Sequence, residues 1–169
     1  YKQTGKCKRL VVAGCLPERY RNQIAGQMPE VDVFIGTGAF DRIVEAVDES
    51  KFSGGCLLPD PTTIVPQEKD APRALSTSHM AYLKVAEGCS QRCTYCIIPK
   101  LRGKKRSRLP QDIIAEAQDL LAAGVKELVL VAQDTTSYGK DLQPPASLSR
   151  LVENLAGLPS LGTADPGAW

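Results

Sequence analysis

The ten residues from Glu87 to Cys96 read EGCSQRCTYC and carry three cysteines in the spacing Cys-x-x-x-Cys-x-x-Cys. The preceding segment AYLKVA, residues 81–86, is mostly apolar and predicts a strand. Structural zinc usually takes four ligands in two separated pairs, but the sequence has no second pair and its only histidine is His79. Three thiolates on an iron–sulfur cubane would instead leave one iron open to a further ligand. The spacing therefore predicts a metal centre in this loop, with a zinc knuckle as the alternative.

The residues before this loop predict alternating strands and helices. The segment LVVA at 10–13 ends at Gly14 and predicts a buried strand, followed by a helix with Pro17 at its first position. A second strand is expected over 31–35, and a helix after it. Its apolar residues recur at helical spacing: Phe40, Ile43, Val44 and Val47. This order is typical of a parallel α/β layer, and residues 1–50 are predicted to form one domain.

A linker is expected at residues 51–78, because prolines and glycines interrupt every periodic pattern there. Order returns in a second predicted domain, residues 79–160. It holds a helix over 110–123 that Gly124 ends, a strand over 127–132, a long loop, and a helix over 147–156. These are the opening units of a parallel α/β barrel or sheet. Residues 161–169 form an atypical tail.

Composition excludes several classes of protein. The 169 residues are 43% hydrophobic and 24% charged, which is typical of a globular chain. No apolar run is long enough for a membrane span and no signal peptide is visible, so a cytoplasmic protein without a membrane partner is expected. Six of the nine residues from Lys100 to Arg108 are basic and none is acidic. That segment predicts a phosphate or nucleic-acid contact, with a solvated loop as the plain alternative.

The three-cysteine spacing, with Tyr95 before the third cysteine, resembles the signature of the radical S-adenosylmethionine enzymes. The resemblance implies that Cys89, Cys93 and Cys96 hold a 4Fe–4S cluster whose open iron binds S-adenosylmethionine. It also places Tyr95 beside the adenine. An electron donor reduces the cluster, which then cleaves the cofactor to a 5′-deoxyadenosyl radical. The cofactor supplies this chemistry, and no side chain is predicted to act as an acid, base or nucleophile.

Two further stretches, VAGCL at 12–16 and EVDVFIGTG at 30–38, resemble the N-terminal domain of the methylthiotransferases within that group. The resemblance implies a second, auxiliary 4Fe–4S cluster held by three cysteines, of which Cys15 matches the last. Cys7 and Cys56 match no ligand. The implied fold is the C-terminal part of that α/β domain, followed by the first β/α units of a partial TIM-like barrel. The chain is accordingly expected to be a fragment of a longer enzyme, inactive by itself.

The loop AQDTTSYGKDL at 132–142 resembles the branch that modifies a ribosomal protein. That branch adds a methylthio group to the β-carbon of an aspartate in a small-subunit ribosomal protein. A second S-adenosylmethionine supplies the methyl group. Gln133 lies at the C-terminal edge of a predicted strand, where parallel α/β folds place ligand contacts, and is expected to contact S-adenosylmethionine. The basic residues 100–108 are expected to face ribosomal RNA or the cofactor entrance.

Two other functions stay open at this point. A methylthiotransferase acting on a tRNA adenosine would share the chemistry, but that branch usually carries GQNVNSYG in the loop where this chain has AQDTTSYG. A non-catalytic module would hold zinc at the three cysteines and bind RNA through residues 100–108. Such a zinc module would be colourless, whereas either methylthiotransferase would absorb visible light through its iron–sulfur cluster.

Overall fold

The structure is a computed structural model that describes residues 2, 4–63 and 79–159. The chain divides into two compact units, one made of residues 1–64 and 91–103 and the other of residues 65–90 and 104–169. Both contain parallel strands and helices, which confirms the predicted α/β class. The predicted tail, 161–169, lies outside the described residues, and the domain boundaries expected from the sequence stay predictions.

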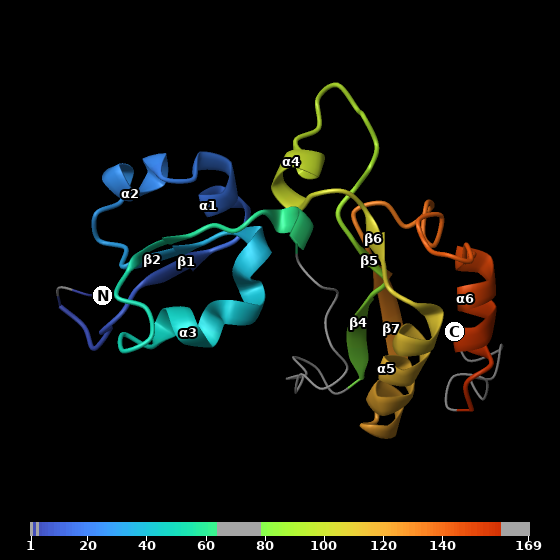
Figure 1. Cartoon of the computed structure of the whole chain (residues 1–169). Helices are drawn as coiled ribbons and strands as arrows, with labels where there is room; N and C mark the ends of the chain where they lie inside the picture. The colour runs from blue at the N-terminus through green and yellow to red at the C-terminus, as the bar shows by residue number, and fades with distance from the viewer. Residues whose placement is uncertain (1, 3, 64–78, 160–169) are drawn as a thin grey trace. The chain divides into compact units, whose positions relative to one another are not determined.

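A three-stranded parallel sheet organises the first unit. Its strands are β1 (Val11–Ala13), β2 (Val33–Ile35) and β3 (Gly55–Leu57), with β2 in the centre. Figure 1 shows α1 and α2 on one face of this sheet and α3 on the other. The helical segments of this unit are α1 (Cys15–Tyr20), α2 (Gln23–Gln27), η1 (Thr37–Arg42), α3 (Ile43–Val47), η2 (Pro61–Thr63) and α4 (Ile98–Arg102).

The central strand explains why so short a sheet holds together. All three residues of β2 are buried, because helices cover both faces of a parallel sheet and leave no solvent side. Val33 and Ile35 pack with Ala39 and Ala46 on one face, while Phe34 packs with Ile24 on the other.

Two sequence predictions for this unit are wrong in detail. Irregular structure was expected throughout 51–78, yet β3 pairs with β2 within it. Gly54 and Gly55 have φ angles of 137° and 96°, so the glycines that suggested a loop lead directly into a strand. The expected apolar helix face is also not the buried one: Val44 is 70% exposed, whereas Ala39 and Ala46 are fully buried. Ala39 lies in η1 with a non-helical backbone and Ala46 lies in α3, and the small size of both side chains lets the backbone approach the sheet.

The second unit pairs β4 (Met80–Lys84) with β7 (Glu127–Val131) in parallel. Between them the chain forms the predicted long helix, α5 (Pro110–Ala122), and α6 (Leu148–Ala156) comes after β7. Gly124, with a φ of 96°, ends the α5 turn as expected. Two elements were not predicted. A two-residue strand β5 (Ala86–Glu87) pairs antiparallel with β6 (Arg106–Ser107), so one strand leads into the cysteine loop and the other follows α4.

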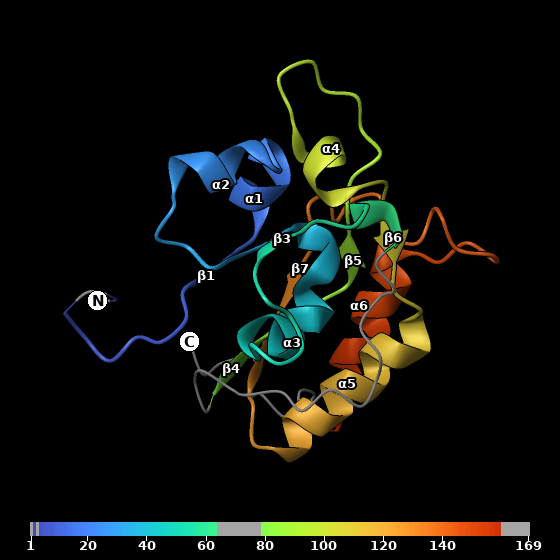
Figure 2. The same ribbon diagram turned by 60° about the vertical axis from the view of Figure 1, so that its left-hand side comes forward.

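One apolar core holds this second unit. Leu83 of β4, Ile113 of α5 and Leu151 of α6 are at most 1% exposed and belong to one cluster. Figure 2 shows α5 and α6 side by side, as their packing through this core requires. Within the described residues, no helix has the length and apolar character to cross a membrane.

Candidate functional site

The second unit places two predicted site residues at the same edge of its sheet. Lys84 and Val131 are register partners at the carboxyl ends of the parallel strands β4 and β7. The segment after β4 leads to Cys89, which is 7% exposed, and the segment after β7 begins with the exposed Gln133. Open parallel α/β sheets bind ligands at this carboxyl edge. Both residues therefore emerge where a bound molecule is expected.

Strand β6 holds the loop that follows Gln133. The Ser107 amide donates to Asp141 Oδ2 at 2.7 Å, and its hydroxyl donates to Oδ1 at 2.6 Å. The same hydroxyl accepts the Gly139 N–H at 2.9 Å. Burial raises the pKa of Asp141, but the two hydrogen bonds from Ser107, a backbone hydrogen bond and the Lys105 charge together hold that pKa below its usual value. Asp141 is therefore a carboxylate at neutral pH, and the loop has a fixed anchor.

Lys105 joins the cysteine side of this edge to the Gln133 side. Its amide donates to Ser90 Oγ at 3.1 Å, one residue after Cys89. Its ammonium donates to the Asp134 carbonyl oxygen at 3.1 Å and also contacts the Ser137 hydroxyl. Burial lowers the pKa of Lys105, while the neighbouring Asp134, Asp141 and Cys89 groups oppose that shift. One side chain thus sets how the two loops of the candidate site lie relative to each other.

Only some of the basic residues in the run from 100 to 108 lie on the surface. Lys105 and Arg108 are 9% and 7% exposed. Arg108 donates to the Lys84 carbonyl oxygen at 2.7 Å and pairs with Glu116 at 2.6 Å. Lys100 and Lys104 are exposed. Fewer charges than the sequence suggested can therefore meet a nucleic acid, because two of them stabilise the second unit.

The burial of Tyr138 makes the stability of the second unit depend on pH. Tyr138 is 2% exposed and its hydroxyl donates to the Arg108 carbonyl oxygen at 2.9 Å. Burial raises its pKa from 10.0 to about 12, although the nearby Arg108 charge opposes the shift. The folded chain thus keeps a proton that the unfolded chain loses above pH 10, so stability should fall as pH rises from about 10 to about 12.

Tyr138→Phe should flatten that part of the stability profile and cost about 1 kcal/mol at neutral pH through the lost hydrogen bond. Urea unfolding of both proteins between pH 8 and pH 12 would measure this. Parallel profiles for the two proteins would contradict the assignment of the pH dependence to Tyr138.

The other two cysteines of the loop and Tyr95 belong to the first unit. Cys93 is exposed, Cys96 is half-buried, and Tyr95 is 91% exposed. The Cys96 amide donates to the Cys93 carbonyl oxygen at 3.1 Å, which closes a turn between the two thiols. Helix α4 starts two residues after Cys96, with Pro99 in its first turn, where a missing N–H costs nothing. Tyr95 packs against no core, so its ring is free to stack on a ligand.

Cys15 lies at the carboxyl edge of the other sheet. β1 ends at Ala13, Gly14 has a φ of 122°, and α1 begins at Cys15, two residues before the start predicted at Pro17. The Cys15 thiol is free and half-buried. Its position at the end of a parallel strand is again one where ligands are commonly bound.

The donor chemistry of these residues fits an iron–sulfur cluster. All six cysteines are free thiols, and three of them lie within one eight-residue stretch. Thiolate is the ligand that such clusters take. Among the described residues, no three cysteine, histidine or acidic side chains are close enough together to bind a metal ion. The ligand set Cys89, Cys93 and Cys96 therefore stays a prediction from the residues and their spacing.

Sequence reasoning missed the residues that hold the loops. Ser107 and Lys105 lie in the basic run and Asp141 lies in the loop at 132–142, but nothing in those stretches marks them as anchors, because their partners are at least 15 residues away. A basic residue that is buried cannot be told from an exposed one by composition. No local signal would have found them.

Comparisons with known proteins agree with the sequence resemblance. Residues 83–156 match the Radical SAM superfamily. A ribosomal protein uS12 methylthiotransferase RimO from Desulfosudis oleivorans is 55% identical over 92% of this chain. Relatives with the same name from Clostridioides difficile and Syntrophus aciditrophicus are 50% and 48% identical over 92% and 95% of it. The chain spans 36% of the length of the first of these relatives, and a similar share of the others.

Proposed function

This chain belongs to the radical S-adenosylmethionine methylthiotransferases, and on that premise we propose that it is part of an enzyme that methylthiolates a ribosomal protein. The substrate is the β-carbon of an aspartate in a small-subunit ribosomal protein. The observation that carries this is the identity of 55% to a protein named for uS12, spread over nearly the whole chain. The enzyme is a transferase that works in the cytoplasm with an external electron donor.

Within this proposal, Cys89, Cys93 and Cys96 hold the 4Fe–4S cluster that binds S-adenosylmethionine. The bound cluster supplies the electron that cleaves the cofactor to a carbon radical. Cys15 contributes one thiolate to an auxiliary cluster. Free thiols and their spacing support these roles.

Tyr95 and Gln133 contact S-adenosylmethionine in this proposal. The 91% exposed ring of Tyr95 offers an aromatic face for the adenine. Gln133 offers an amide at the carboxyl edge of β7, and Lys105 holds the loop behind it. With Lys105 and Arg108 buried, the exposed Lys100 and Lys104 and the half-buried Arg102 and Arg106 are left to meet ribosomal RNA.

Anaerobic reconstitution of this chain with iron and sulfide tests the metal centre. We expect a reducible cubane signal in electron paramagnetic resonance that changes when S-adenosylmethionine is added. Retained zinc without an iron signal would contradict the proposal and favour a metal-binding module. An iron signal indifferent to S-adenosylmethionine would also contradict it, because the open iron is the defining feature of the site.

The substrate is tested in a chimera in which this chain replaces the matching residues of the Desulfosudis oleivorans relative. Mass spectrometry should then find the methylthio group on the small-subunit ribosomal protein and not on tRNA. The reverse result would assign the chain to the tRNA-modifying branch.

A further inference from the structure

One buried threonine joins the helix that follows Cys15 to the helix that follows Cys96. Thr37 is 1% exposed and comes directly after β2 and Gly36. Its amide donates to Glu18 Oε2 in α1 at 3.1 Å. Its hydroxyl donates to the Leu101 carbonyl oxygen in α4, which is 64 residues away in sequence. All of these residues belong to the first unit.

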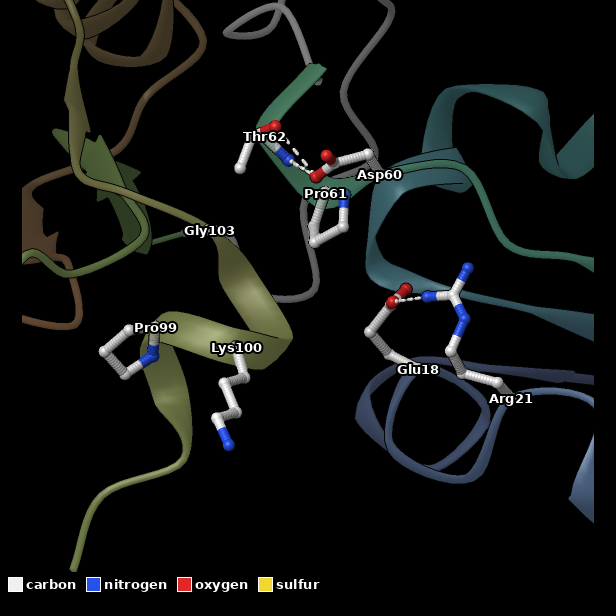
Figure 3. A pocket seen from close by; sticks show the side chains of 8 residues that line it. All are labelled: Glu18, Arg21, Asp60, Pro61, Thr62, Pro99, Lys100 and Gly103. Carbon is white, nitrogen blue, oxygen red and sulfur yellow. Dashed lines mark hydrogen bonds and ion pairs between the residues drawn. The ribbon is translucent and has the colours of Figure 1, made fainter.

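The Glu18 carboxylate is itself fixed in place. It is 4% exposed, and the Arg21 guanidinium donates to its Oε1 and, at 2.5 Å, to the Leu58 carbonyl oxygen after β3. Figure 3 shows the Glu18–Arg21 pair on one side of a cavity of about 340 Å³ and Pro99 and Lys100 of α4 on the other. A buried carboxylate that accepts two hydrogen bonds, from the Arg21 guanidinium and the Thr37 amide, is costly to move, since any displacement leaves polar groups unpaired.

Gly36 shows how closely this contact is built. Its φ of −72° is ordinary for any residue. A Cβ there would lie 2.2 Å from Glu18 Oε2, far inside van der Waals contact. Glycine is therefore needed because the carboxylate occupies the space of a side chain, and the loop after β2 is shaped around Glu18.

Both ends of this contact lie close to proposed cluster ligands. Glu18 is three residues after Cys15 in the same helix, and α4 begins two residues after Cys96. The backbone of α4 carries no capping side chain at its first residue, so its position depends on contacts such as the one with Thr37.

We propose that Glu18 and Thr37 are positioning residues that set the place of α4, and with it Cys93 and Cys96, relative to the helix that carries Cys15. The consequence of this positioning for catalysis rests on the proposed function, in which Cys15 binds one cluster and Cys93 and Cys96 bind the other. The contact itself exists in the chain without metal. The two proposals therefore fail separately.

Amide hydrogen exchange of the metal-free chain tests the contact. Thr37→Val keeps the shape of the side chain and removes its hydroxyl, so amides within residues 91–103 should exchange about 3- to 10-fold faster. Thr37→Ser should restore the slow exchange. Thr62→Val is the matched control, because Thr62 borders the same cavity as Pro99 and Lys100 of α4, but its hydroxyl bonds to Asp60 at 2.7 Å rather than to a carbonyl oxygen of α4.

Spin labels at Cys15 and Cys96, with the other cysteines replaced by alanine, test the positioning directly. Thr37→Val should broaden the distance distribution between the two labels, and Thr37→Ser and Thr62→Val should leave it narrow. An unchanged distribution in Thr37→Val, or equal broadening in Thr62→Val, would overturn the proposal. If the unchanged chain binds no iron while the distance distributions behave as expected, the proposed function is contradicted and the positioning proposal stands.

Discussion

Cys93→Ala should lower the iron content of the reconstituted chain from about four atoms to background. In the proposed function the cluster takes three thiolates, from Cys89, Cys93 and Cys96, and two would not hold it because no other soft donor is near in sequence. Cys93 is exposed, so alanine there disturbs no packing and the effect reports on ligation. Iron and sulfide analysis together with the visible absorption spectrum would measure the loss.

Cys56→Ala is the control for this experiment. Cys56 is also a free thiol, but it lies in β3 opposite Phe34 and has no proposed ligand role. Iron content should stay at the level of the unchanged chain. Equal iron in the Cys93 and Cys56 variants would remove Cys93 from the ligand set and with it the proposed metal centre.

Gly139→Ala should destabilise the second unit by about 2 to 5 kcal/mol. Gly139 has a φ of 77°, which alanine rarely adopts, and a Cβ there would lie 2.3 Å from the Ala146 carbonyl oxygen. That oxygen is backbone and cannot rotate away. The loop must therefore shift, and the shift disturbs the Ser107 hydroxyl that accepts the Gly139 N–H. Urea unfolding followed by circular dichroism would give the change.

Gly124→Ala separates the cost of the positive φ from the cost of the steric contact. Gly124 also has a positive φ, 96°, but a Cβ there meets no atom within 4 Å. It should cost only the conformational strain, about 1 to 2 kcal/mol. Similar losses for both variants would show that the contact with Ala146 is relieved without cost, and that the loop after Gln133 is less closely held than described.

The elements that were predicted correctly are those whose pattern is local. α5 and α6 show apolar residues at helical spacing, and Gly124 marks the end of the α5 turn. β7 is a continuous apolar run after its first residue, Glu127. Each of these signals is complete within one segment of the chain, so periodicity alone identifies them.

The elements that were missed depend on partners. β3 has three residues and glycines beside it, and it is a strand because β2 offers it a ladder of hydrogen bonds. The expected face of α3 failed for the same reason: Ala46 lies against the sheet and Val44 does not, and only the packing decides which side is buried.

By itself, the sequence determined the α/β class, the candidate ligands Cys89, Cys93 and Cys96 and the resemblance to the methylthiotransferases, because spacing within one loop is a local property. The tertiary structure alone decided that Lys105 and Arg108 are buried in the second unit, and that Thr37 reaches Leu101. Burial of a polar group is favourable only where a partner satisfies it, and these partners come from distant parts of the chain. The chemistry of a site can thus be predicted from neighbouring residues, whereas the contacts that hold it in place arise only on folding.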